Sequence, residues 1–213
     1  QNVNARKTKM TLWAIVPVKP LRRGKSRLAN ILTEDERTAL NQNLLVNTIK
    51  TLSTIDRIHK IMVVSRDPAA LTFSREHGAI TVRENGNPEL NTALRRAAAV
   101  AETQLVNEIL IIPADIPLIS KKEINHILDH GGKPPEMVIC PDRRKDGTNL
   151  LYLNPIGMIQ FNYGSGSFQK HLSQAERAGL RIEIVESESI GLDLDLPEDL
   201  ELLKLYQAAE LTR

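Results

Sequence analysis

Aromatic residues, cysteines and an excess of one charge are all scarce in this chain of 213 residues. Aromatic residues make up 3% of it, too few for the stacking platform of a single-stranded nucleic-acid binder. The single cysteine, Cys140, excludes an internal disulfide, fits a reducing, cytoplasmic setting, and lies in the apolar run MVIC, where we expect a core residue. A formal net charge of +2 does not indicate a polyanion partner, so basic residues matter only where they cluster.

Long apolar runs are also missing. None approaches the ~18 residues that a membrane helix needs, and the polar, basic start QNVNARKTK lacks the apolar middle of a signal peptide. We therefore expect no membrane segment. Met10 stands directly before the first predicted strand, so residues 1–9 are expected to be a tag or a disordered tail. Residues 10–213 are long enough for a single domain with a sizeable core.

Strand and helix patterns alternate along the chain. Short apolar runs predict buried strands, and apolar residues at helical spacing predict the helices between them. Such alternation predicts a mainly parallel mixed sheet with helices on both faces, a three-layer α/β/α fold, whose ligands bind at the carboxyl ends of the strands. The expected strands are 12–18, 59–65, 79–84, 108–115, 136–142, 149–155 and 181–187, and the expected helices are 37–52, 67–78, 88–106, 121–128, 167–179 and a last one to about 206.

A basic loop with the sequence PLRRGKSRL follows the first strand. It offers Lys19, Lys25 and Arg27 around Gly24, which permits a tight backbone. Lysine point charges, arginine forks and loop N–H groups suit a phosphate chain. Neither the P-loop pattern nor the GxGxxG fingerprint is present. A solvated basic turn is the alternative interpretation.

Acidic residues stand at two later points, one at the end of an expected strand and one in a segment after the last expected strand. Asp115 closes EILIIPAD, and Asp193 and Asp195 lie two apart in GLDLDLPEDL, where an extended backbone puts both side chains on one face. Magnesium, or manganese, takes one or two carboxylates together with phosphate oxygens and water. The alternatives are a turn or N-cap aspartate and an ordinary acidic loop. Glu198 and Asp199 instead resemble first-turn acids of the last helix.

A second anion site is predicted further along the chain. Thr148 follows the turn Asp146-Gly147 at the start of a strand, and YGSGS leads into a helix. Gly164 and Ser167 there would offer backbone N–H groups and a hydroxyl at a helix N-terminus. A plain turn with a serine N-cap is the alternative. A nucleotide, a metal and a second anion together indicate phosphoryl or nucleotidyl transfer.

These segments together resemble a known family. WAIVPVKPLRRGKSRLA, NPELNTAL, IIPADIPLI, DGTNLL, YGSGSFQKH and GLDLDLPEDL occur in this order, over about Leu12 to Leu200. The combination resembles the guanylyltransferases of deazaflavin coenzyme F(420) biosynthesis, which activate 2-phospho-L-lactate or phosphoenolpyruvate with GTP. The resemblance implies a single domain of the nucleotidyltransferase, nucleotide-diphospho-sugar transferase (GT-A-like) type that acts on small molecules. Monomer and homodimer both stay open.

Roles follow by position from that resemblance. It implies that Lys19, Lys25 and Arg27 hold the triphosphate of GTP, and that Asn87 and Asn91 of NPELN contact the base. It implies that Asp115, Asp193 and Asp195 hold the metal, with Asp115 and the basic residues serving catalysis. Thr148, Gly164 and Ser167 are the implied phospho-acid ligands; Asn149, where many members have Thr or Ser, departs from the pattern and bears on acceptor choice.

Other interpretations stay open from the sequence. A nucleotidyltransferase for a sugar phosphate or molybdopterin would typically open with a glycine-rich loop, which VPVKPLRRGKS is not. A non-catalytic nucleotide-binding regulator would keep the basic loop without the aspartates. A basic nucleic-acid module is disfavoured by the few aromatics and modest charge. Phosphoenolpyruvate leads 2-phospho-L-lactate and 3-phospho-D-glycerate as the expected acceptor.

Overall fold

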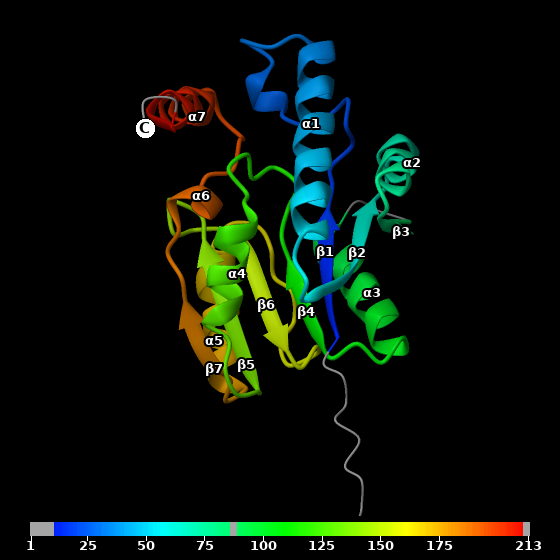
Figure 1. Cartoon of the computed structure of the whole chain (residues 1–213), viewed down its shortest axis with the longest axis vertical. Coiled ribbons are helices and arrows are strands. Elements are labelled where there is room, and N and C mark those ends of the chain that lie inside the picture. Colours follow the sequence, from blue (N-terminus) through cyan, green and yellow to red (C-terminus); the bar gives the residue numbers. More distant parts are fainter. Residues whose placement is uncertain (1–10, 86–88, 211–213) are drawn as a thin grey trace, which may run out of the picture.

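The computed structural model describes residues 11–85 and 89–210. Residues 1–9, expected to be a tag or tail, and Asn87, expected near the base, lie outside this part of the chain. Seven strands of the described part form one sheet in the order β3-β2-β1-β4-β6-β5-β7 (Figure 1). They are β1 (Leu12–Pro17), β2 (Ile58–Ser65), β3 (Ile80–Arg83), β4 (Glu108–Ile111), β5 (Glu136–Pro141), β6 (Thr148–Asn154) and β7 (Arg181–Ile184).

The sheet is mixed and mainly parallel, as expected. β1 pairs in parallel with β2 and β4, β2 with β3, and β5 with β7, whereas β6 runs antiparallel to both β4 and β5. All seven expected strands are present, but β4 ends at Ile111, short of the expected range to 115. Proline has no N–H for a sheet ladder, and Pro113 follows two residues later.

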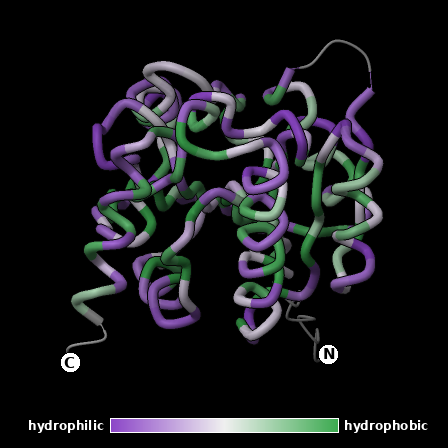
Figure 2. The backbone as a smooth tube through the Cα atoms, turned by 90° about the horizontal axis from the view of Figure 1, so that it is seen from above, coloured by the Kyte–Doolittle hydropathy of each residue, from purple (hydrophilic) through white to green (hydrophobic). Residues whose placement is uncertain are grey.

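Helices cover both faces of the sheet, which confirms the three layers. One core cluster joins α1 (Glu34–Ser53), α2 (Pro68–Glu76) and α4 (Lys121–Asp129) to one face, and the other joins α3 (Leu90–Thr103) and α5 (Ser167–Arg177) to the opposite face. Neighbouring residues of β1 alternate between the two clusters, as the period of two requires. Seen from above, hydrophobic segments gather inside and hydrophilic ones lie mostly outside (Figure 2).

Local signals explain where the helices start. Thr33 and Glu36 form the expected capping box, in which the Glu36 N–H donates to Thr33 Oγ1 (3.2 Å) and the Thr33 N–H donates to the Glu36 carboxylate (2.7 Å). Asp67 caps α2, whose first residue is Pro68. The sequence patterns missed two short elements, the 3₁₀ turn η1 (Ser26–Leu28) and α6 (Glu188–Gly191), because both are too short to show a helical period.

The environment of the single cysteine agrees with the expectation from the sequence. Cys140 is fully buried in β5, and burial, followed by the nearby Glu123 charge, raises the pKa of its thiol to about 12. It is therefore a core residue, as expected.

The last helix, α7 (Pro197–Glu210), extends to one side of the body in Figure 1. Within residues 11–85 and 89–210, no helix is long and apolar enough to cross a membrane.

Candidate active site

A cleft of ≈ 710 Å³ opens at the edge of the sheet where the parallel strands end. β6 runs the opposite way, so it is the first residue of that strand, Thr148, that reaches this edge. The cleft lies where the rule for parallel α/β sheets predicts it. Among its lining residues are the predicted site residues Lys19, Lys25, Arg27, Asp115, Thr148, Gly164, Ser167, Asp193 and Asp195.

The basic loop after β1 is fastened to the helices beside it. The Leu21 N–H donates to the Asp67 carboxylate (2.9 Å), and the Leu21 carbonyl accepts from Asn41 Nδ2 (2.7 Å). Gly24 is needed here because a Cβ would lie 2.7 Å from that same Asn41 nitrogen. Leu28, fully buried, anchors the end of the loop. These contacts hold the loop in place beside the cleft.

The basic side chains of this loop fall into two kinds. Lys19 and Arg27 are exposed at the rim, and Arg27 forms no hydrogen bond or ion pair with any residue that the structure describes. Lys25 is buried in a left-handed backbone conformation, and its ammonium donates to the Leu194 carbonyl and lies 3.8 Å from Asp195 Oδ1. Lys25 therefore fastens the acidic segment to the basic loop, a contact that sequence patterns did not predict.

Three aspartates come to the cleft from two distant segments. Asp115 lies beyond the end of β4, and its backbone carbonyl accepts from the Leu194 N–H (3.0 Å), which brings the acidic segment beside it. Asp193 Oδ1 is 3.5 Å from Asn149 Nδ2, and Asp195 faces Lys19 at 4.0 Å. The backbone hydrogen bond between Leu194 and Asp115 thus brings Asp115 beside the segment that carries Asp193 and Asp195, as expected.

Burial raises the pKa of two of these carboxyl groups. For Asp115, burial outweighs the opposing effect of Lys25, and the Asp195 charge adds to the rise. For Asp193, burial acts first and the charge of Asp115 second. A raised carboxyl pKa records an electrostatic cost of the ionised form, and a bound cation would remove it.

The acidic cluster fits a divalent cation in part. In the described residues, no group of three or more His, Cys, Asp or Glu side chains is close enough to hold a metal ion by itself. However, Asp115 Oδ1 is buried without a hydrogen-bond partner among the described residues, and the Asp195 charge repels the Asp115 carboxylate. Magnesium accepts one or two protein carboxylates when phosphate oxygens complete its shell. The arrangement therefore suits a cation that arrives with a nucleotide.

The opposite wall of the cleft carries hydroxyl and backbone donors. Ser167 Oγ donates to Thr148 Oγ1 (3.3 Å), which is also 3.0 Å from the His171 ring. Gly164 and Ser165 line the cleft, and their N–H groups donate to no described residue. The Thr148 hydroxyl and both N–H groups can therefore donate to an anionic ligand, whereas the single Ser167 proton is used in the bond to Thr148.

The N-terminus of α5 is less open than the sequence pattern suggested. The Gly166 N–H donates to Asp146 Oδ1 (3.0 Å), the Phe168 N–H to the Asp146 carbonyl (3.1 Å), and the Ser167 N–H to the Gly164 carbonyl (3.1 Å). Asp146 thus occupies two N–H donors of this N-terminus, and the Ser167 N–H, an expected ligand donor, is bonded within the turn. The free donors of this loop are shifted to residues 164 and 165.

Asn91 holds the wall of the cleft rather than lining it. Its Oδ1 accepts from the Tyr163 N–H (2.7 Å), and its Nδ2 donates to the Tyr163 carbonyl (3.2 Å). This pair of bonds fixes the segment directly before Gly164. A contact of Asn91 with a base stays a prediction, and its amide is already engaged with the protein.

Sequence patterns missed several residues that shape the site. Tyr163 lines the cleft, and its buried hydroxyl has no hydrogen-bond partner in the described part of the chain. Asp199, expected only to complement a helix, is 1% exposed and accepts from the Asp195 N–H (3.0 Å) and from Arg143 (2.6 Å). An acid two residues after a proline gives no signal that it will be buried. Its partner Arg143 lies in a hairpin more than fifty positions away in the sequence.

Comparison with known proteins agrees with this geometry. The sequence model of the family described as guanylyl transferase CofC like matches residues 12–212. The chain belongs to this family. It is 38% identical over 92% of its length to a phosphoenolpyruvate guanylyltransferase of Rubrobacter xylanophilus, of which it covers 94%. It is 41% identical over 87% of its length to a 2-phospho-L-lactate guanylyltransferase of Methanocaldococcus jannaschii, of which it covers 79%.

Comparison with solved structures shows which fold this chain has. A nucleotidyl transferase from Methanothermobacter thermautotroptrophicus superimposes with a TM-score of 0.66 at 15% identity, over 92% of this chain and 97% of that one. At that identity the likeness shows the fold alone. The expected nucleotidyltransferase fold is confirmed, and the family membership makes the chain an enzyme of the nucleotidyltransferase class.

Proposed function

We propose that this chain transfers GMP from GTP to a small phospho-acid and releases pyrophosphate. The observation that supports this most is the single cleft in which the basic loop, Asp115 with the 193–195 segment, and the Thr148 wall face one another. Each of the three suits one part of the reaction: a triphosphate, a cation and a second anion. Relatives named as guanylyltransferases support the same reaction.

The reaction needs no protein nucleophile. An oxygen of the acceptor phosphate, already ionised near neutral pH, attacks the α-phosphorus of GTP. The bond between that phosphorus and the oxygen bridging to the β-phosphate breaks, and pyrophosphate leaves with the electron pair. The product carries a diphosphate link between guanosine and the acid. The protein's work is to position the two anions and offset their charge.

The residues divide this work between the two walls of the cleft. Lys19 and Arg27, exposed at the rim, would pair with the departing β- and γ-phosphates. Asp115, Asp193 and Asp195 would hold magnesium or manganese, which when bound offsets the negative charge of acceptor and α-phosphate. Thr148 and the N–H of Gly164 would hold the phospho-acid directly, and Ser167 would support them through its hydrogen bond to the Thr148 hydroxyl. Asn87 and Asn91 remain our proposal for the base.

The acceptor is proposed as phosphoenolpyruvate, with 2-phospho-L-lactate as the second choice. One of the two relatives is named for phosphoenolpyruvate and the other for 2-phospho-L-lactate. The chain covers 94% of the first and 79% of the second. The two acids share a phosphate and a carboxylate and differ in the bond between the phosphate-bearing carbon and the terminal carbon, which is double in phosphoenolpyruvate and single in 2-phospho-L-lactate. The resemblance to coenzyme F(420) enzymes places the product in the biosynthesis of that deazaflavin.

Pyrophosphate release tests the proposal directly. Purified protein receives GTP, magnesium and one of phosphoenolpyruvate, 2-phospho-L-lactate or 3-phospho-D-glycerate, with ATP and CTP as nucleotide controls. We expect release with GTP and one acid. Folded protein that releases none with any of the three acids would contradict the proposed function, and equal release with CTP would contradict the guanine preference.

A further inference from the structure

His171 lies behind the acceptor wall and has no access to solvent. It stands on α5, is fully buried, and contacts two groups through its two ring nitrogens. Nε2 accepts a hydrogen bond from the backbone N–H of Asn162 (3.0 Å), and Nδ1 lies 3.0 Å from Thr148 Oγ1. The ring of Tyr163 packs edge-on against the imidazole with the centroids 5.0 Å apart. Nothing in the proposed reaction requires this histidine to touch substrate.

The contact with Asn162 decides which nitrogen carries the proton. A backbone N–H can only donate, so Nε2 must hold a lone pair. Burial, followed by the nearby Lys170 charge, lowers the pKa of His171 to about 4, so the ring is neutral near neutral pH. A neutral imidazole has one N–H, which must then be at Nδ1. Nδ1–H therefore donates to Thr148 Oγ1.

Thr148 consequently receives two hydrogen bonds at one oxygen. His171 Nδ1–H and Ser167 Oγ–H both donate to it, which occupies both lone pairs of a hydroxyl. The remaining Thr148 proton has no acceptor among the residues that the structure describes. Thr148 is 5% exposed and lines the cleft, so its hydroxyl proton is free to point into the cleft.

We propose that His171 is a positioning residue that commits the Thr148 hydroxyl to donating a hydrogen bond to the phospho-acid. The inference rests on the proposed function, because it names the acid as the acceptor. Phosphate and carboxylate oxygens only accept, so a threonine free to turn its lone pairs toward them would lose the bond and add repulsion. A histidine with a fixed tautomer removes that choice before the substrate arrives.

Two substitutions separate the two bonds of His171. In His171→Gln, the amide oxygen can reach the former Nε2 position and accept from Asn162, but nothing donates to Thr148. In His171→Asn, the shorter amide can place an N–H at the former Nδ1 position, but the Asn162 N–H loses its acceptor. We expect H171Q to raise the KM for phosphoenolpyruvate about tenfold or more. We expect H171N to keep that KM near the wild-type value.

Unfolding measurements distinguish positioning from a merely structural role. H171N should be the less stable of the two, since it leaves a buried N–H unpaired, while H171Q should bind the acid more weakly. If KM instead follows stability, with H171N the weaker binder, the proposal is overturned. His126→Gln, an exposed histidine on α4, is the matched control and should leave both the KM values and stability unchanged.

A double-mutant cycle tests the route through Thr148. In a Thr148→Val background, H171Q should change the KM for phosphoenolpyruvate less than about twofold, because the hydroxyl it acts on is gone. An undiminished effect would overturn the proposal. The KM for GTP should stay near the wild-type value in H171Q, because the two substrates face different walls.

The tautomer provides a readout that needs no turnover. Proton–nitrogen spectra of histidine-labelled wild-type protein should show His171 with the proton on Nδ1, and H171Q identifies the signal by its loss. A proton on Nε2 in an active enzyme would overturn the role of His171 and leave the proposed function intact. An inactive wild type with the expected tautomer would instead overturn the proposed function, and with it the ligand assigned to Thr148.

Discussion

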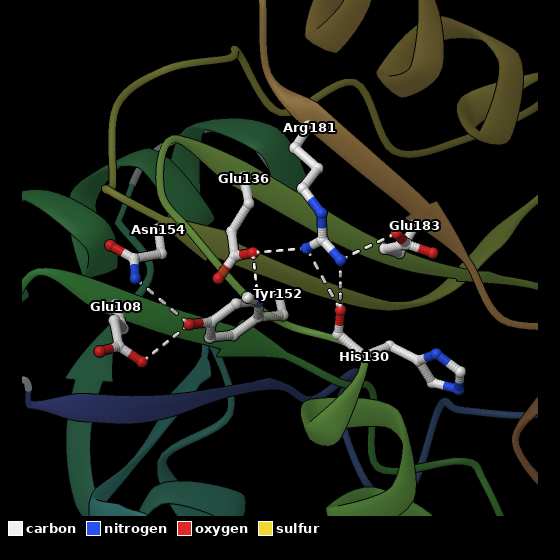
Figure 3. A network of polar contacts seen from close by, with 8 residues as sticks. Glu108, His130, Glu136, Tyr152, Asn154, Arg181 and Glu183 are labelled. Carbon is white, nitrogen blue, oxygen red and sulfur yellow. Dashed lines mark hydrogen bonds and ion pairs between the residues drawn. The ribbon is translucent and has the colours of Figure 1, made fainter.

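Buried polar groups are paired with one another at the edge of the sheet where the parallel strands begin, and some are unpaired at the edge where those strands end. At the edge where the parallel strands begin, Glu136 accepts from Arg181 (2.9 Å) and from the Gly132 N–H (2.6 Å), and the Tyr152 hydroxyl donates to Glu108 (2.9 Å) (Figure 3). At the other edge, Asp115 and Tyr163 line the cleft, and the Asp115 Oδ1 and Tyr163 hydroxyl atoms are buried without a partner among the described residues.

The difference separates stability from function. Buried polar groups that pair with one another stabilise the fold, whereas unpaired ones cost free energy unless a ligand completes them. In the described residues, the other two buried side-chain atoms without a partner belong to Arg37 and Thr48 on α1. The cleft therefore combines unpaired groups with an opening, and that combination is what a binding site requires. Substitutions at the two edges should separate activity from stability.

The largest effect is expected at Asp115. Asp115→Asn keeps the shape but removes the charge proposed to hold the cation, so turnover should fall by about 10²–10³-fold. Stability should not fall, because the carboxylate has an unpaired buried oxygen and a pKa raised by burial. Pyrophosphate release and urea unfolding of the same preparation measure both. Near-normal turnover would remove Asp115 from the proposed metal site.

Arg181 should show the reverse behaviour at the opposite edge. Arg181→Ala leaves the Glu136 carboxylate, which is 2% exposed, without its cation. Loss of a buried pair costs several kcal/mol, and because Arg181 is about 41% exposed we expect about 2 kcal/mol. Turnover per folded molecule should be unchanged. Arg177→Ala, an exposed arginine on α5, is the control and should change stability by less than about 0.5 kcal/mol.

Most of the fold could be predicted because its signals are local. Each buried strand is a short apolar run, and the capping box at Thr33 marks a helix start. The strand-end rule then located Asp115. The fourth strand nevertheless ended earlier than its apolar run, because prolines interrupt the ladder. Local patterns thus identified elements well and their ends less well.

The site could be predicted only in part because its partners are far apart in the chain. Lys25 gave no sign that it would be buried against Leu194, and His171 gave none that it would face Thr148. These contacts depend on the sheet order, which brings β6 between β4 and β5. The residue types of the site are visible in the sequence, but the choice of hydrogen-bond partners is a property of the folded chain.

Acidity should stabilise the cleft edge when metal is absent. The pKa of Asp115 is higher in the folded chain than its ordinary value of 3.8, so the folded state binds a proton more tightly than the unfolded state does. Its contribution to stability is therefore fully present below 3.8 and is lost as pH rises through the raised folded pKa. Asp193 acts in the same direction.

Urea unfolding with a chelator between pH 4 and pH 8 tests this sign. The free energy of unfolding of wild type minus that of D115N should become smaller as pH rises. Magnesium should oppose the loss, because the cation and the proton compete for the same oxygens. A difference that grows with pH would show that Asp115 is stabilised in its charged form by the protein alone.

The smallest and most direct contrast uses one substitution at both edges. Tyr152→Phe removes a hydroxyl that donates to the buried carboxylate of Glu108, so stability should fall by about 1–2 kcal/mol while turnover is kept. Tyr163→Phe removes a buried hydroxyl that has no hydrogen-bond partner within residues 11–85 and 89–210, so stability should not fall. If that hydroxyl serves a substrate, the KM for GTP or for the acid should rise by a few fold instead. Removal of a tyrosine hydroxyl would then lower stability in Tyr152→Phe and weaken substrate binding in Tyr163→Phe. Equal losses of stability in the two variants would show that the Tyr163 hydroxyl is paired within the fold.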